Sequence, residues 1–186
     1  MQALTALIQT ICSIDDSAQK ALSEIAEIKS YPRNAVVQEI GTSCKTVYWV
    51  QSGCARIYYD KDGNDITEYF AFSGDIVVRA ESLFTGLPAT KGIQTLEETV
   101  LVAISSEKLF RLFDTHHDLE RMFRLMVEKA FVQTVKRIES LQFKSARERY
   151  LELLETTQWV QKIPLKYIAS YLGITQVSLS RIRAGI

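Results

Sequence analysis

The chain has few of the residues that metal centres and disulfide frameworks need. Its 186 residues include two histidines, and neither lies between residues 30 and 104. The three cysteines, Cys12, Cys44 and Cys54, are scattered and form no Cys-x-x-Cys pair. Zinc and iron–sulfur sites are therefore not expected, and neither is the ligand cluster of a cupin-like metal oxygenase. We expect no metal site, no catalytic residues, and cysteines that are small buried or half-buried side chains.

The chain also lacks long apolar runs. No stretch approaches the roughly 20 apolar residues that a membrane-spanning helix needs. The first residues, MQALTALIQTICSIDDS, have no basic segment and carry polar side chains throughout, unlike a secretion signal. We therefore expect a cytoplasmic protein that has no membrane partner.

The net charge is zero, but the charge is unevenly divided along the chain. Its 22 basic residues balance 22 acidic ones. Residues 144–186 carry seven basic and three acidic side chains, a local charge of +4, and residues 1–143 carry the compensating −4. This division indicates that only the C-terminal part meets a polyanion such as nucleic acid.

Short β-rich runs fill the region from about residue 35 to residue 104. Turn signals such as QSG, DKDGN and FSGD separate them. In YYDKDGNDITEYF, the Asp-Gly-Asn cluster supplies the positive φ angles of a tight hairpin turn. Strands this short and close together predict a β-sandwich or barrel and not a parallel α/β sheet. The runs are AVVQEI, TVYWVQ, CARIYYD, ITEYFAF, DIVV, KGIQTL and TVLVAI.

Helical patterns flank this region on both sides. Residues 4–29 have apolar residues at helical spacing, with SIDDS as an interruption that can cap the second piece. Ser105 or Ser106 is expected to cap a short helix. Ser145 is expected to cap the later amphipathic helix in SARERYLELLETT.

Residues 118–142 predict one long helix with two apolar stripes. Because such a helix needs two partners, one stripe should cover the β-rich domain and the other should pack on the same helix of a second subunit. The alternative is a helix buried wholly within its own chain. The second stripe comprises Val127, Phe131, Val135, Ile138 and Leu141. We assign the dimer contact to Leu119, Met122, Phe123, Met126 and Ala130.

The C-terminal residues predict two short helices around a glycine turn. Pro164 suits the start of the first helix, Gly173 suits the turn, and Thr175 can cap the second helix. Inward apolar positions then leave a polar and basic outer face without an acidic residue, which suits a helix that enters the major groove of DNA. The outward residues, which we expect to bind DNA, are Gln176, Ser178, Ser180, Arg181 and Arg183.

The order of these parts resembles the CRP/FNR family of bacterial transcription regulators, over nearly the whole chain. VYWVQSGCARIYYDKDGND resembles the family's β-hairpin, FSGD the start of its phosphate-binding cassette, and IASYLGITQVSLSRIR its DNA reader. The resemblance implies an α+β fold with an N-terminal double-stranded β-helix (jelly-roll) sensor domain at residues 1–117. It further implies a long dimerisation helix at residues 118–143 and a small all-α helix-turn-helix domain at residues 144–186. The family's β-hairpin wing is expected to be lacking.

The resemblance also implies a function. The chain would bind a palindromic operator in double-stranded DNA as a homodimer under the control of a small-molecule effector, with RNA polymerase as a candidate partner. Gln176 and Arg181 occupy positions that often touch bases in the family, and Ser180 and Arg183 lie close by.

The cassette departs from the family pattern. Where the family has Gly-Glu and then an Arg followed by Ser or Thr, this sequence has Gly74-Asp75 and Ala89-Thr90. The family's arginine neutralises a cyclic phosphate, which a methyl group cannot do. We therefore expect that cAMP is not the effector and that the site takes either another small anion or no ligand. The candidate effector residues are Gly74, Asp75, Arg79, Thr90 and Lys91.

A second interpretation is a ligand-binding signalling module whose helical tail contacts a protein. The polar and basic outer face of the last helix argues against it, because protein-binding helices more often present an apolar anchor.

Overall fold

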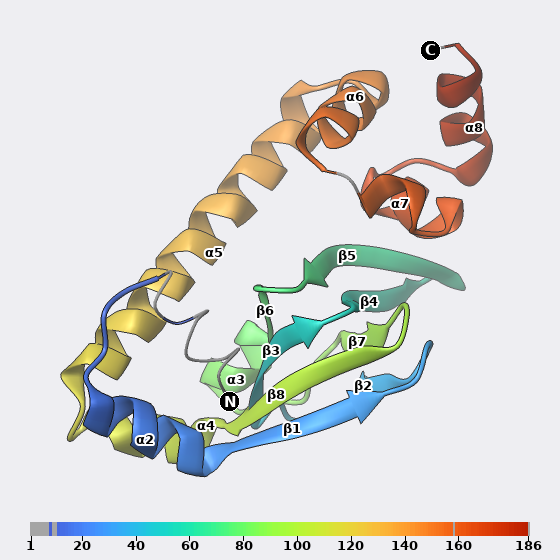
Figure 1. Ribbon diagram of the computed structural model, residues 1–186. Coiled ribbons are helices and arrows are strands. Elements are labelled where there is room, and N and C mark those ends of the chain that lie inside the picture. The colour runs from blue at the N-terminus through green and yellow to red at the C-terminus, as the bar shows by residue number, and fades with distance from the viewer. Residues whose placement is uncertain (1–7, 9–10, 158, 186) are drawn as a thin grey trace.

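The computed structural model describes residues 8, 11–157 and 159–185, which form a β-roll, a long helix and a C-terminal group of helices (Figure 1). The β-roll consists of two four-stranded antiparallel sheets, with strand orders β1-β8-β3-β6 and β2-β7-β4-β5. Buried side chains such as Val50, Ala71 and Leu101 form one apolar cluster within the roll. The predicted α+β class and double-stranded β-helix are confirmed. The strands are β1 (Ala26–Tyr31), β2 (Val36–Gln38), β3 (Thr46–Ser52), β4 (Cys54–Lys61), β5 (Asn64–Phe72), β6 (Ile76–Val77), β7 (Gly92–Thr95) and β8 (Thr99–Ser105).

The seven predicted β-rich runs correspond to β2–β8, and the structure adds one strand that the pattern missed. Residues 26–29 were expected to be helical, but they belong to β1, which pairs with β8 over six residues. Pairing with a strand far along the chain overrides the local helical spacing. Residues 4–7, 9 and 10 of the same predicted helix lie outside the described residues. The hairpin turn is confirmed, because Asp62 and Gly63 have φ angles of 56° and 79°.

Capping side chains define where the helices begin. Asp15, Ser105, Ser145 and Thr175 each accept a backbone N–H bond at an N-cap, and Ser145 forms a full capping box with Glu148. The helices are α2 (Asp16–Ile25), α3 (Ala80–Thr85), α4 (Ser106–Phe113), α5 (His117–Phe143), α6 (Ala146–Thr156), α7 (Leu165–Tyr171) and α8 (Gln176–Ala184), with a 3₁₀ turn, η1, at Trp159–Gln161. None of the helices in the described part of the chain is both long and apolar enough to cross a membrane.

Helix α5 corrects the residues assigned to the dimer contact. Leu119, Met122 and Met126 are buried in the same apolar cluster as residues of α2, α4 and the β-roll. Phe123 packs against the rings of Phe84, Phe110 and Phe113. Because the first half of α5 covers the end of the roll, the buried Leu119, Met122 and Met126 are not available to a partner, whereas Phe123 is half-buried. Ala130 is exposed. The exposed apolar residues of α5 are Val127, Phe131, Val132, Val135, Ile138, Leu141 and Phe143.

The C-terminal helices pack directly on the β-roll. Helix α7 lies along β5 (Figure 1). Cys54, Phe70 and Leu96 of the roll share one apolar cluster with residues of α6, η1, α7 and α8. The rings of Phe70 and Phe72 pack on Trp159 with centroid separations of 5.0 and 4.8 Å. The helical end of the chain is therefore attached to the β-roll by an aromatic interface around the buried Phe70.

A test of the roll uses two glycines that differ in their surroundings. Gly53 has a φ of 90°, and a Cβ atom there would lie 2.5 Å from the carbonyl oxygen of Glu98. We expect Gly53→Ala to lower the free energy of unfolding by about 3 kcal/mol, through backbone strain and overpacking together. Gly63 also has a positive φ but has open space around it, so Gly63→Ala should cost only about 1 kcal/mol. Urea unfolding measures both, and equal losses would contradict the steric account.

Candidate functional site

The C-terminal helix pair is held by a tight turn. Gly173 has a φ of 70°, a left-handed conformation that suits glycine, and Ile174 N–H donates to the carbonyl of Ala169 at 3.0 Å. Thr175 Oγ1 accepts from Ser178 N–H at 3.1 Å and so begins α8. Leu179 is fully buried and anchors α8 against α7. The turn and the anchor fix which face of α8 points outward.

The outward face of α8 carries most of the residues that the sequence predicted. Gln176, Ser180, Arg181 and Arg183 are exposed. Ser178 is half-buried, with its hydroxyl 2.9 Å from that of Thr175, so it contributes to the cap. The sequence of α8, QVSLSRIRA, contains no acidic residue. This face can donate hydrogen bonds and carries positive charge at its C-terminal end.

Arginines outside α8 hold the helix pair in place. Arg137 of α5 donates to the carbonyl of Tyr171 at 2.7 Å, and its guanidinium lies 3.9 Å from the centre of that ring. Arg149 of α6 donates to the carbonyl of Leu172 at 2.8 Å. Both arginines satisfy carbonyls at the end of α7, where a helix favours positive charge. Arg149 is one of the seven basic residues between 144 and 186, and in the structure its guanidinium positions the helix pair.

Two of the five predicted effector residues lie in the turn between β5 and β6. Gly74 has a φ of 99°, and its carbonyl accepts from Trp49 Nε1 at 3.2 Å. The carboxylate of Asp75 accepts from Phe72 N–H at 3.0 Å. Burial raises the pKa of Asp75, the hydrogen bond from Phe72 opposes this, and the charge of Lys129 opposes it further. The carboxylate of Asp75 therefore closes the turn, and the contacts that define Gly74 and Asp75 are internal to the roll.

The structure brings two of the other candidates together through a residue that the sequence analysis missed. Arg79, at the start of α3, and Lys91, just before β7, both form ion pairs with Glu68 of β5. Thr90 is exposed, whereas Ala89 is buried. Nothing in the local pattern of β5 marks Glu68, because its position depends on how β5 pairs with β4. The region of the predicted effector residues thus contains two cations, Arg79 and Lys91, that share the carboxylate of Glu68.

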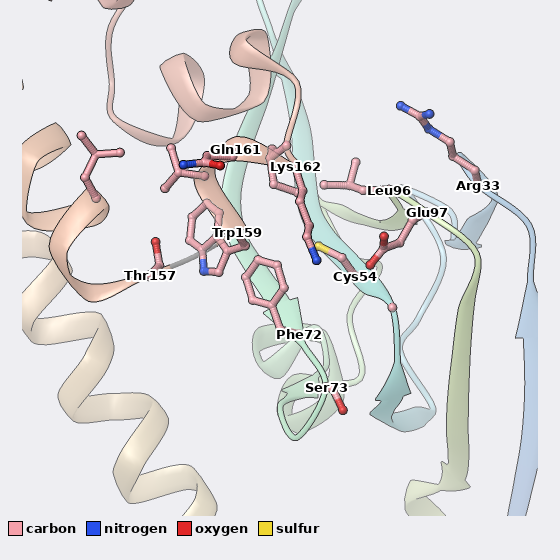
Figure 2. A pocket seen from close by; sticks show the side chains of 14 residues that line it. Arg33, Cys54, Phe72, Ser73, Leu96, Glu97, Thr157, Trp159, Gln161 and Lys162 are labelled. Carbon is pink, nitrogen blue, oxygen red and sulfur yellow. The ribbon is translucent and has the colours of Figure 1, made fainter. Parts of the chain in front are cut away.

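A separate cleft lies where the C-terminal helices meet the roll. It has a volume of about 790 Å³, and its lining residues come from both units, without any of the five predicted effector residues. Figure 2 shows Lys162 extending toward Cys54, with the stacked rings of Phe72 and Trp159 beside it. Burial raises the pKa of Cys54 to about 12, so its thiol is a neutral part of the wall.

The burial of Asp75 generates a pH-dependent prediction. Because its pKa is raised above the ordinary value of 3.8, the folded chain binds more protons than the unfolded chain in the window just above that value. Stability should therefore fall as the pH rises through the window. Asp75→Asn keeps an oxygen that can accept from Phe72 and removes the buried charge, so we expect a higher free energy of unfolding at neutral pH and no such decline. Urea unfolding at a series of pH values measures the free energy of unfolding of the wild type and of Asp75→Asn, with the exposed Asp114→Asn as the control. If Asp75→Asn kept the pH dependence of the wild type, Asp75 would not be its source.

Comparisons with known proteins agree with this architecture. Residues 28–116 match the family model of the cyclic nucleotide-binding domain. No curated relative matches the chain at a significant level of sequence similarity.

Solved structures resemble the chain over almost its whole length. The c-di-GMP-responsive global regulator CLP of Xanthomonas campestris is 19% identical, with a TM-score of 0.74 over 92% of this chain and 91% of its own. A regulator of the CRP/FNR family from Eubacterium rectale is 20% identical, with a TM-score of 0.72 over 91% and 82%. The catabolite activator protein of Thermus thermophilus is 18% identical, with a TM-score of 0.58 over 92% and 83%. Residues 28–116 therefore resemble the cyclic nucleotide-binding domain, and the chain as a whole has the fold of these regulators.

Proposed function

We propose that the chain is a transcription regulator of the CRP/FNR type that binds operator DNA as a homodimer under the control of a small-molecule effector. The observation that carries this proposal is the outward face of α8, on which Gln176, Ser180, Arg181 and Arg183 are exposed together. The division into a sensor (residues 1–117), a dimerisation helix (118–143) and a DNA-binding unit (144–186) is part of the proposal, and so is RNA polymerase as a further partner.

The side chains of α8 suit the major groove. A glutamine can form two hydrogen bonds with adenine, and an arginine can form two with guanine or bind a phosphate. Val177, which is 62% exposed, offers an apolar contact of the kind that recognises a thymine methyl group. The same valine is the one feature of α8 that favours the alternative, a tail that docks on a protein.

The exposed stripe of α5 supports the homodimer. Phe131 is 68% exposed and lies among the apolar residues named above, beyond the part of α5 that the roll covers. A second copy of the same helix would bury this stripe in a two-fold contact and present two copies of α8 to two half-sites.

We propose an effector other than cAMP. Ala89 stands where the family's phosphate-binding arginine is expected, and Arg79 and Lys91 are paired with Glu68. The Xanthomonas relative is described as responsive to c-di-GMP. We therefore propose another anionic ligand for the β-roll.

The DNA contact can be tested with two arginines. Operator sequences are first selected from random double-stranded DNA by binding to the full chain. Arg181→Ala and Arg183→Ala should each weaken binding to the selected DNA about tenfold or more, because each removes a phosphate or base contact. Fluorescence anisotropy at several salt concentrations measures the affinity and its salt slope. The control is Arg111→Ala, an exposed arginine on α4. Failure to enrich any sequence, or equal binding by all the variants, would refute DNA reading by α8. If the Arg181 and Arg183 variants instead lost a protein partner in a pull-down, that result would favour the alternative of a protein-binding tail.

The dimer can be tested with one residue of the exposed stripe. Phe131→Asp places a charge in the middle of the proposed two-fold contact and should weaken self-association at least about 30-fold, as expected for the loss of an interface hot spot. Sedimentation equilibrium measures the dissociation constant. Ile28→Asp, at a residue of β1 that is 52% exposed, is the matched control and should leave association unchanged. A dimer that persists in the Phe131 variant would show that the contact lies elsewhere.

A further inference from the structure

Strand β5 contains a bulge at its middle. Ile57 of β4 pairs with Tyr69 and Tyr58 pairs with Thr67, so Glu68 is the extra residue between them. A bulge disrupts the regular ladder and redirects the side chains around it. Thr67 and Glu68 are therefore neighbours in sequence that contact different parts of the molecule.

On one side of the bulge, Glu68 serves two cations. Its carboxylate lies 3.2 Å from Nη1 of Arg79 and also contacts Nζ of Lys91. Arg79 is 7% exposed, and its Nε is buried without a hydrogen-bond partner among the described residues. A buried N–H of a charged group without a partner is costly and calls for a further acceptor. One carboxylate shared between two cations leaves both positive charge and a donor unsatisfied.

On the other side of the bulge, Thr67 holds α7. Its backbone N–H donates to Oγ of Ser170 at 3.0 Å. Its hydroxyl accepts from Nη1 of Arg56 at 3.0 Å, and the guanidinium of Arg56 lies 3.9 Å from the centre of the Tyr167 ring. Thr67 therefore contacts α7 directly through Ser170 and indirectly through Arg56, and α7 is the helix that positions α8.

We infer that Glu68 is an internal counter-ion which an anionic effector displaces from Arg79 and Lys91, and that the bulge passes this displacement to α7 through Thr67 and Ser170. The inference rests on the proposed effector role of the β-roll. The ligand class is a small molecule with an oxyanion group, phosphate or carboxylate. Such a group can reach Nε of Arg79 as well as the terminal nitrogens, which the carboxylate of Glu68 does not do here.

The Lys91–Glu68 pair is the part of this cluster that solvent reaches, because the side chain of Arg79 is 9% exposed. The side chains of Glu68 and Lys91 are 35% and 26% exposed, so an ion can approach them from solvent. A ligand shifts a conformational equilibrium only as far as its affinity differs between the two states. The state with Glu68 paired has a weaker site for an anion than the state with Glu68 released, which gives the required difference.

The displacement can be tested with inorganic phosphate and the full chain. Calorimetric titration at constant ionic strength compares the wild type with Glu68→Gln, Lys91→Gln and the control Glu128→Gln, an equivalent carboxylate paired with Arg124 on α5. We expect Glu68→Gln to bind phosphate at least about fivefold more tightly, because an ion pair no longer competes. Lys91→Gln should bind more weakly, and Glu128→Gln should match the wild type. Unchanged or weaker binding by the Glu68 variant would overturn the inference; a parallel acetate titration shows which oxyanion is preferred.

The coupling can be tested at the Thr67 amide by hydrogen exchange. Saturating phosphate should raise the exchange rate of Thr67 severalfold in the wild type. In Ser170→Ala the exchange should already be fast and should no longer respond to phosphate. Phosphate binding that leaves the Thr67 rate unchanged would overturn the transmission through the bulge. Neither measurement contains DNA, so its failure is distinct from a failure of the proposed operator binding, which the α8 variants test.

Discussion

The structure depends on one buried guanidinium at the boundary between the β-roll and the C-terminal helices. Arg56 is 2% exposed, and its donors bond the carboxylate of Asp65 at 2.6 and 2.7 Å and Gln94 at 2.8 and 3.0 Å. A buried charge is tolerated only when its donors are satisfied in this way. The guanidinium lies 3.9 Å from the centre of the Tyr167 ring of α7 and 4.8 Å from the centre of the Tyr58 ring of β4. Since one wall of this site belongs to α7, the C-terminal helices complete a site whose other walls are strands of the β-roll.

This shared site limits how the two units can move. The aromatic contacts of Phe70 and Phe72 with Trp159 extend the same interface, and rotation of the helix pair would have to break them together with the cover over Arg56. Packed interfaces of this kind change between discrete arrangements and do not deform smoothly. The cleft of about 790 Å³ marks the part of the boundary that packing leaves open, and Lys162 extends into it. Any rotation of the C-terminal helices must therefore alter contacts made by β4 and β5.

Local signals in the sequence predicted the helix pair, and pairing between distant strands explains what they missed. Gly173 and Thr175 define the turn before α8 by their own chemistry, so that part could be recognised from a few residues. The strand at Ala26–Tyr31, and the positions of Glu68 and Arg56, depend on which residues face them across the sheets. The two stripes of α5 were visible as a pattern, but which of them faces inward depends on where α2 and α4 pack. The roles assigned to the α8 side chains and to the effector residues stay predictions.

Most of the basic residues near the C-terminus form contacts within the chain. Of the seven basic residues between 144 and 186, Lys144 pairs with Glu152, while Arg147 and Arg149 bond the carbonyls of Gly185 and Leu172. Lys166 lies over the ring of Tyr167. Much of the basic character therefore holds the C-terminal helices together, and α8 itself carries two cations, Arg181 and Arg183. Because each phosphate contact contributes only a modest, salt-dependent part of the affinity, one copy of such a helix is expected to bind weakly. Two copies fixed by the α5 contact would bind at the same time, which makes the dimer a requirement of the proposed function.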